Sequence, residues 1–152
     1  KTNYPASLVV GNIDEDPNYE ILFSAEKIYA YNHDGTPCLG AWPVTIQAGH
    51  TSLIIADLGG SGPNEIIARS KRIILRPEGQ KEMLHILNGS GSLLSTFYPD
   101  ACPSNIFEND YEYTSAAVGN FYTDAQLEGA TTYGCKGVAA IRAGQCWVYQ
   151  CR

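Results

Sequence analysis

The chain has 152 residues, of which 44% are hydrophobic and 17% charged, a balance typical of a folded globular protein and not of a disordered one. Its net charge of −6 argues against a nucleic-acid partner, because phosphates need cationic side chains to neutralise them. No segment approaches the roughly 18 consecutive apolar residues that a membrane-spanning helix requires. Fifteen Gly, eight Pro and ten Tyr favour strands and turns over helices.

Three similar segments follow one another along the chain, at 8–22, 53–67 and 116–130. In each, a short apolar strand ends in Gly or Ala, Asn or Asp comes directly after it, and a Glu stands eight residues later. The strand that follows ends in a tight turn, and Gly35 and Gly91 can supply the positive φ that such turns need. Self-similarity of this kind is typical of a repeat architecture.

Each repeat predicts four antiparallel strands. In the first repeat we expect them near 6–10, 20–24, 27–31 and 36–46, and in the second near 51–56, 65–75, 81–87 and 92–97. In the third they are expected near 114–118, 128–133, 137–141 and 145–150. The predicted fold class is therefore all-β, a β-propeller-like array of three four-stranded antiparallel blades.

The repeats place the blades at about 5–46, 50–98 and 113–152 of a single domain, 1–152, with an insertion at 99–112. Three blades cannot close a ring, since propellers typically need about four to eight. We therefore expect the chain either to be part of a longer one or to form a homo-oligomer, two copies of which would supply six blades.

Oxygen-bearing residues alternate along the first loop, which predicts a metal site. A hard cation takes about six to eight oxygen ligands. Asn12, Asp14, Asp16 and Glu20 can offer side-chain oxygens, and Asn18 can offer its carbonyl. The alternative is an Asx-type turn, in which the same side chains accept main-chain N–H bonds. The second and third loops have fewer carboxylates, and we expect neither to hold a metal tightly.

The first loop resembles the FG-GAP/VCBS repeat, whose hallmark is a D-x-D-x-D-G-x-x-[DE] loop between the first two strands of a blade. Residues 12–20 match its first, third, fifth and ninth positions, with Asn12 for the first Asp and Pro17 for the Gly. The segment 29–43 is similar to the Gly-Trp-Pro-containing segment of bacterial secreted members. The resemblance implies a propeller, Ca²⁺ as the cofactor of the loop, and an extracellular or cell-surface location.

No catalytic residue can be assigned. His33, His50 and His85 lie in none of the zinc or triad motifs. We therefore expect a non-catalytic binding or scaffolding module that recognises a protein or a glycan. The alternative is a fragment of a carbohydrate-active enzyme, a polysaccharide lyase or hydrolase.

Aromatic side chains are the candidate ligand contacts. They are Phe107, Tyr111 and Tyr113 of the insertion, together with Trp42. Their rings can stack on a ligand, and packing within the protein is the alternative use of the same residues.

The chain has an odd number of cysteines, so at least one is free or pairs between chains. They are Cys38, Cys102, Cys135, Cys146 and Cys151. Thiols throughout, or a disulfide among the last three, remain the alternatives.

Overall fold

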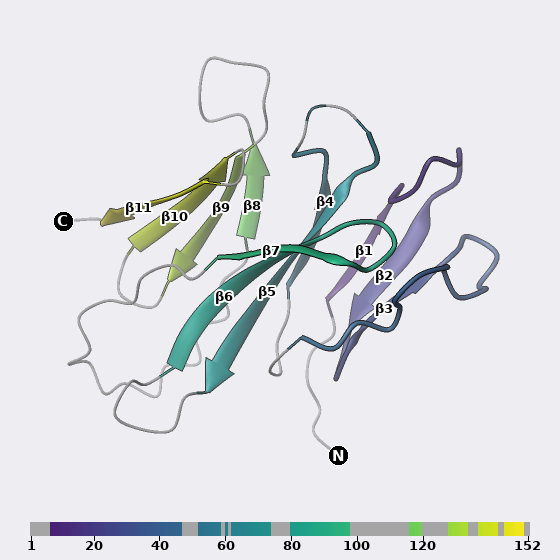
Figure 1. The fold of residues 1–152 in the computed structure, drawn as a ribbon, viewed down its shortest axis with the longest axis horizontal. Helices are drawn as coiled ribbons and strands as arrows, with labels where there is room; N and C mark the ends of the chain where they lie inside the picture. The colour runs from purple at the N-terminus through teal and green to yellow at the C-terminus, as the bar shows by residue number, and fades with distance from the viewer. Residues whose placement is uncertain are drawn as a thin grey trace.

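The computed structural model describes residues 7–46, 52–58, 60, 62–73, 80–97, 116–119, 128–133, 137–142 and 145–150. Within these ranges the chain contains strands and no helix, which confirms the all-β prediction (Figure 1). Accordingly, this part of the chain has no helix long and apolar enough to cross a membrane. The predicted insertion at 99–112 lies outside the described residues.

The strands form three antiparallel sheets in chain order. The first sheet contains β1 (Leu8–Gly11), β2 (Glu20–Ser24) and β3 (Ile28–Tyr31). The second contains β4 (Leu53–Ala56), β5 (Glu65–Ile73), β6 (Gln80–Leu87) and β7 (Leu93–Phe97). The third contains β8 (Ala116–Gly119), β9 (Glu128–Tyr133), β10 (Gly137–Arg142) and β11 (Gln145–Gln150). All eleven strands lie within about two residues of predicted ones.

The prediction of a fourth strand at 36–46 in the first sheet is wrong. This segment is joined to β3 only by isolated bridges, between Tyr31 and Pro37 and between Ile28 and Val44. The physical reason lies in its residues, because proline has no N–H to donate to a ladder. In addition, Gly40 has a φ of 120°, which no regular strand adopts.

The register repeats as the sequence does. The first two strands of the three sheets pair Leu8 with Phe23, Leu53 with Ala68 and Ala116 with Thr131. The two partners are the same number of residues apart in all three pairs. Because register decides which residues share a face, the three sheets present equivalent positions to equivalent sides.

The second sheet lies between the other two and is buried on both faces. Strand β4 lies against both β1 and β8 (Figure 1). The core between the first and second sheets contains Ile13, Leu22, Ile28, Ala30, Leu53, Ile66, Ala68 and Leu87. The cluster on the other side of the second sheet contains Ile67, Leu84 and Ile86, with Ile54, Leu58 and Val118 against them. Because neighbouring residues of a strand point to opposite faces, a sheet covered on both sides needs unbroken apolar runs.

The turn between β6 and β7 of the second sheet packs closely against the loop that joins β1 to β2. A Cβ added to Gly89 would lie 1.6 Å from the carbonyl oxygen of Ile13, so only glycine permits this approach. Trp42 donates its indole N–H to the carbonyl oxygen of Gly89 at 3.0 Å. Ala41 donates its main-chain N–H to the carbonyl oxygen of Ser90 at 2.8 Å. The turn therefore contacts the acidic loop at Ile13 and the segment after β3 at Ala41 and Trp42.

Candidate metal centre

The loop that joins β1 to β2 is held in shape by its own side chains. Asn12 Oδ1 accepts the N–H of Asp14 at 3.2 Å, Asp14 Oδ1 accepts that of Asp16 at 2.9 Å, and Asp16 Oδ1 accepts that of Asn18 at 2.6 Å. Asn12 also donates its Nδ2–H to the carbonyl oxygen of Asp16. The Asx-type turns left open as an alternative are therefore present. Each aspartate uses Oδ1 in its turn and has a second oxygen, Oδ2.

Glu20 lies beneath these two aspartates and is almost fully buried, with 1% of its surface exposed. Its Oε2 accepts the main-chain N–H of Ile13 at 2.9 Å. Its Oε1 is also buried and has no hydrogen-bond partner among the described residues. One oxygen of each of Asp14, Asp16 and Glu20 lies within 4.8 Å of the other two. These three residues could hold a metal ion.

Burial raises the pKa of the Glu20 carboxyl above its ordinary value of 4.5. The hydrogen bond from Ile13 opposes this rise, and the charges of Asp14 and Asp16 add to it. One oxygen of this carboxyl group is thus buried without a hydrogen-bond partner among the described residues, and the group lies near two like charges. A cation among the three oxygens would remove both costs.

The second loop shares the glutamate but not the cluster. Glu65 Oε2 accepts the main-chain N–H of Leu58 at 2.8 Å, as Glu20 accepts that of Ile13. Asp57 Oδ1 accepts the N–H of Gly60 at 2.6 Å. Among the described residues, only the first loop has a cluster of three or more potential metal-binding side chains. In both loops, therefore, the glutamate has a structural role that is separate from metal binding.

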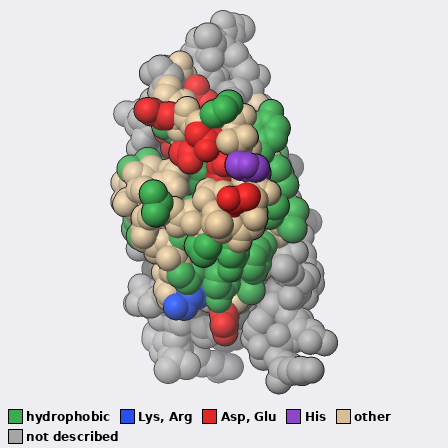
Figure 2. Space-filling view, turned by 90° about the vertical axis from the view of Figure 1, so that its right-hand side faces the viewer, with side chains coloured by type: hydrophobic (Ala, Val, Ile, Leu, Met, Phe, Trp, Pro, Cys, Tyr) green, Lys and Arg blue, Asp and Glu red, His purple; other side chains and the backbone are tan. Residues whose placement is uncertain are grey.

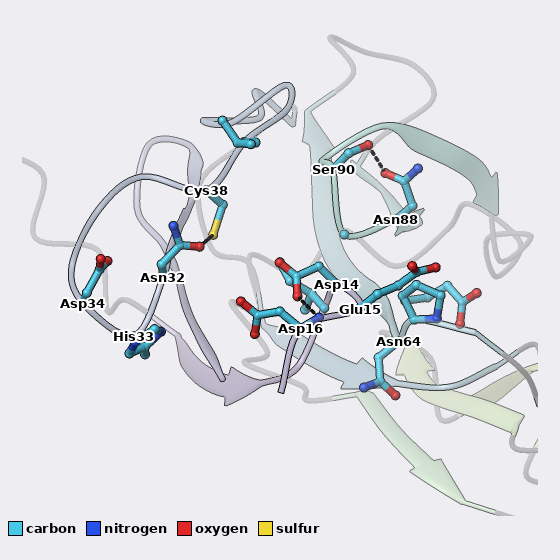
Figure 3. A pocket seen from close by; sticks show the side chains of 15 residues that line it. Asp14, Glu15, Asp16, Asn32, His33, Asp34, Cys38, Asn64, Asn88 and Ser90 are labelled. Atoms are coloured by element: carbon cyan, nitrogen blue, oxygen red, sulfur yellow. Dashed lines mark hydrogen bonds between the residues drawn. The ribbon is translucent and has the colours of Figure 1, made fainter. Parts of the chain in front are cut away.

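An open cavity of about 830 Å³ lies beside the loop, at the junction of the first two sheets. Asp14, Glu15 and Asp16 line its centre, and the turn after β3 contributes Asn32, His33 and Asp34 (Figure 3). The second sheet contributes Asn64, Glu65, Asn88 and Ser90. Figure 2 shows carboxylates gathered with a histidine on this part of the surface. The cavity therefore combines negative charge with amide and hydroxyl groups.

Asn64 connects the second sheet directly to the acidic loop. Its Nδ2–H donates to the main-chain oxygen of Asn12, with 2.6 Å between the two atoms. The sequence pattern did not identify Asn64, because the partner lies 52 residues away along the chain. The only signal was its place one residue before the repeated glutamate.

Cys38 is a free, half-buried thiol that also lines the cavity. It donates to Asn32 Oδ1 at 3.3 Å. Burial raises the pKa of Cys38 to about 11, with further contributions from the charges of Glu20, Asp14 and Asp16. The thiol is therefore close enough to report the charge state of the acidic loop.

The structure brings together three of the five predicted ligands. The side chain of Asn12 takes part in hydrogen bonds of the loop itself, and the main-chain carbonyl of Asn18 stays a predicted ligand. Trp42 is half-buried and packs against the core between the sheets. The other predicted ligand contacts, Phe107, Tyr111 and Tyr113, lie outside the described residues.

Of the other two histidines, His85 is described by the structure and His50 is not. His85 is buried in β6, where its Nδ1 lies 3.0 Å from Thr96 Oγ1. His50 lies outside the described residues. Of the five cysteines, only the thiol of Cys38 is described.

Comparison of the chain with protein-family models, with curated proteins and with solved structures gives no match. The FG-GAP/VCBS resemblance therefore rests on the residues quoted for it.

Proposed function

We propose that this chain is a non-catalytic binding module of FG-GAP/VCBS-like propeller blades, stabilised by Ca²⁺ at Asp14, Asp16 and Glu20. The observation that carries the proposal is the buried Oε1 of Glu20. This oxygen has no partner among the described residues, and one carboxylate oxygen of Glu20 lies within 4.8 Å of an oxygen of each aspartate. The bond from Ile13 uses Oε2 alone, so Oε1 is free to bind a cation.

Calcium is the cation that suits these ligands best. All three are carboxylates, and hard cations prefer oxygen. Asp14 and Asp16 are exposed, so water can complete the six to eight ligands that calcium usually takes. Mg²⁺ demands a stricter octahedral arrangement and gives up its water reluctantly. An extracellular location, which the family resemblance implies, would supply calcium at the concentrations that weak sites of this type need.

Three features support the propeller arrangement. The three sheets are antiparallel and follow one another in chain order. Their first strands lie together, with β4 between β1 and β8. Their registers are equivalent, so each sheet turns corresponding residues toward its neighbour. Face-to-face sheets with adjacent inner strands are the arrangement of blades around a propeller axis.

The cavity beside the loop supports a role in binding. It lies at the junction of two sheets, where ligand sites often occur, and its wall contains carboxylates, amides and hydroxyls. A protein or a glycan could contact these groups. The calcium ion would then set the shape of one wall, because Asp14 and Asp16 belong to both the ion site and the cavity.

Thermal unfolding with CaCl₂ and with EGTA tests the metal site. At a calcium concentration a hundredfold above Kd, binding stabilises a fold by about 2.7 kcal/mol. For a domain of this length that raises Tm by roughly 5–10 °C. We expect this rise in the parent chain and its loss in the Asp14→Asn/Asp16→Asn double variant. Asp34→Asn is the matched control, since Asp34 lines the same cavity outside the triad.

An equal Tm in CaCl₂ and EGTA for the parent chain would overturn the calcium proposal. A polysaccharide-degradation screen tests the non-catalytic part. Turnover of a polysaccharide that is lost in Asp14→Asn would favour the carbohydrate-active alternative instead.

A further inference from the structure

One face of the first sheet packs against the second sheet, and the opposite face is uncovered by any described residue. We call this second face the outer face. Its members are apolar or aromatic and occupy two cross-strand rows, Leu8–Phe23–Tyr29 and Val10–Ile21–Tyr31. Exposed fractions are 64% for Leu8, 56% for Val10 and 37% for Ile21. Figure 2, which views the molecule from the side of the first sheet, shows a continuous hydrophobic area below the carboxylates.

The aromatic side chains of the outer face are already ordered. The ring of Phe23 stacks on that of Tyr29 at 4.9 Å and lies 6.0 Å from that of Tyr31, with nearly parallel planes in both pairs. A contiguous apolar area of this kind on a sheet usually marks a surface that another protein element covers. Pre-ordered rings lower the entropy that such docking would cost.

The outer face corresponds to a surface that is covered in the second sheet. By register, Leu8, Val10, Ile21 and Phe23 correspond to Leu53, Ile55, Ile66 and Ala68. Those four residues of the second sheet pack in the core against the first sheet. The third sheet behaves likewise, because Val118 corresponds to Ile55 and packs toward the second sheet. The outer face is thus one half of an interface that the chain already forms twice.

The other half of this interface has its counterpart on the third sheet. At both existing junctions it is the opposite face of the preceding sheet, which in the second sheet includes Ile54 and Ile67. The corresponding positions in the third sheet are Ala117 and Ala130, which pair with each other. Ala117 is exposed. One chain therefore presents both of the surfaces that join sheets.

Over the first three strands of each sheet, residue sizes at the two surfaces are complementary. The outer face has Phe23 and Tyr31 where the second sheet has Ala68 and Leu87, so it is bulkier than its counterpart. The matching row of the third sheet has alanine at 117, 130 and 140, where the second sheet has isoleucine at 54, 67 and 86. In the fourth strand this row continues with Trp147, beyond the three strands of the first sheet. Sheets pack best when large residues face small ones.

We propose that the outer face of the first sheet binds a second copy of this chain, through the row of the third sheet that contains Ala117. The contact is head-to-tail, and two such contacts close a ring, because two copies with three sheets each supply six. This inference rests on the propeller part of the proposed function and is independent of the calcium part.

Sedimentation velocity of the full chain over a range of concentrations tests the proposal. The parent chain is expected to sediment as a dimer. Val10→Glu is expected to be monomeric or to have a dimer Kd at least tenfold higher than the parent. Leu94→Glu is the matched control, because Leu94 is 55% exposed on β7 of the second sheet and does not belong to the outer face. Its dimer should persist. Far-UV circular dichroism checks that each variant keeps its strands, and Leu8→Glu serves as the second variant of the outer face.

A second set of variants distinguishes head-to-tail from face-to-face pairing. Ala117→Arg alters only the opposite surface, and it should also give a monomer. Mixing Ala117→Arg with Val10→Glu should restore dimers, since one intact contact can form between the two chains, and misfolded variants could not do this.

Dimers that survive Ala117→Arg but not Val10→Glu would mean that two outer faces pair with each other, which overturns the proposal. A monomeric parent chain would overturn it too and would point to another sheet of a longer chain as the occupant. A mass that grows beyond two copies would overturn ring closure. Melting with calcium and EGTA, read on the same samples, reports separately on the metal site.

Discussion

Asn64, one residue before β5, donates its side-chain N–H to the main-chain oxygen of Asn12, with 2.6 Å between the two atoms. The bond joins the loop of one sheet to the candidate metal loop of the sheet before it. Asn12 in turn accepts the N–H of Asp14 through its side chain. The position of the candidate metal ligands is therefore linked to the packing of the first two sheets.

Replacing Asn64 by Asp should destabilise the chain. The carboxylate has nearly the same shape as the amide but cannot donate, so Asn12 O would lose its partner and face a negative oxygen. Such a loss costs roughly 1–3 kcal/mol. Urea unfolding measures it, and Ser90→Ala is the control, because the bond of Ser90 to Asn88 is exposed. An Asn64→Asp variant as stable as the parent would show that this bond does not join the two sheets.

Glu20→Gln and Glu65→Gln should behave differently although both glutamates make the same main-chain bond. Glutamine keeps the oxygen that accepts the N–H of residue 13 or 58. In Glu20→Gln the calcium-dependent rise in Tm should fall by at least half, because a charged ligand has been removed. In Glu65→Gln the rise should be unchanged. Thermal unfolding with CaCl₂ and EGTA makes the comparison, and equal calcium responses in the two variants would contradict the assignment of Glu20.

The stability of the metal-free chain should fall as pH rises above the ordinary pKa of glutamate. The pKa of Glu20 is raised above 4.5 on folding, so just above that pH the folded state binds more protons than the unfolded one. Stability is then greatest below this window and declines through it. Urea unfolding in EGTA between about pH 4 and 7 measures the slope. Glu20→Gln should make it shallower, and an unchanged slope would assign the effect to other groups.

Calcium should compete with protons at the same carboxylate. Because ligands must be deprotonated to bind, calcium affinity should weaken as pH falls through the raised pKa of Glu20. Isothermal titration calorimetry at two pH values, one inside and one above the window, measures the change. Affinity that is independent of pH would remove Glu20 from the ligand set.

The thiol of Cys38 should react slowly with iodoacetamide, and calcium should speed the reaction. With a pKa of about 11, only on the order of one thiol in a thousand is ionised at pH 8. Calcium would neutralise the nearby carboxylates while the burial remained, so the rate should rise by roughly two- to fivefold. Mass spectrometry of the peptide that contains Cys38 measures the rate. The same calcium effect in the Asp14→Asn/Asp16→Asn variant would mean that the ion acts elsewhere.

The strands could be predicted because the spacing of the repeats and the residues that end each strand are visible within short segments of the sequence. Gly or Ala followed by Asn or Asp marks the end of β1 and β4, and a glutamate eight residues after the Asn or Asp begins β2 and β5. Both boundaries are therefore visible in the repeat. The strand predicted at 36–46 is absent because local residues in this segment disfavour a regular strand. Its apolar residues do pack on the core, as Trp42 and Val44 show, but Pro37 and Gly40 prevent a regular ladder.

The candidate metal site was predictable only in part. Alternation along the loop identified Asp14, Asp16 and Glu20, because spacing is visible in a single segment. It could not show that Asn12 would be used within the loop, since metal ligation and Asx turns need the same residue types. Nor could it identify Asn64 or Cys38, whose places beside the loop depend on how separate segments pack.

The bond between Glu65 and the N–H of Leu58 has a consequence for how such an array can change over time. Because one oxygen of the glutamate closes the loop without any ion, a repeat can lose its aspartates and still fold. Ion binding can therefore be acquired or discarded one sheet at a time while the scaffold persists. Two neighbouring repeats of one chain can then respond differently to the same rise in calcium.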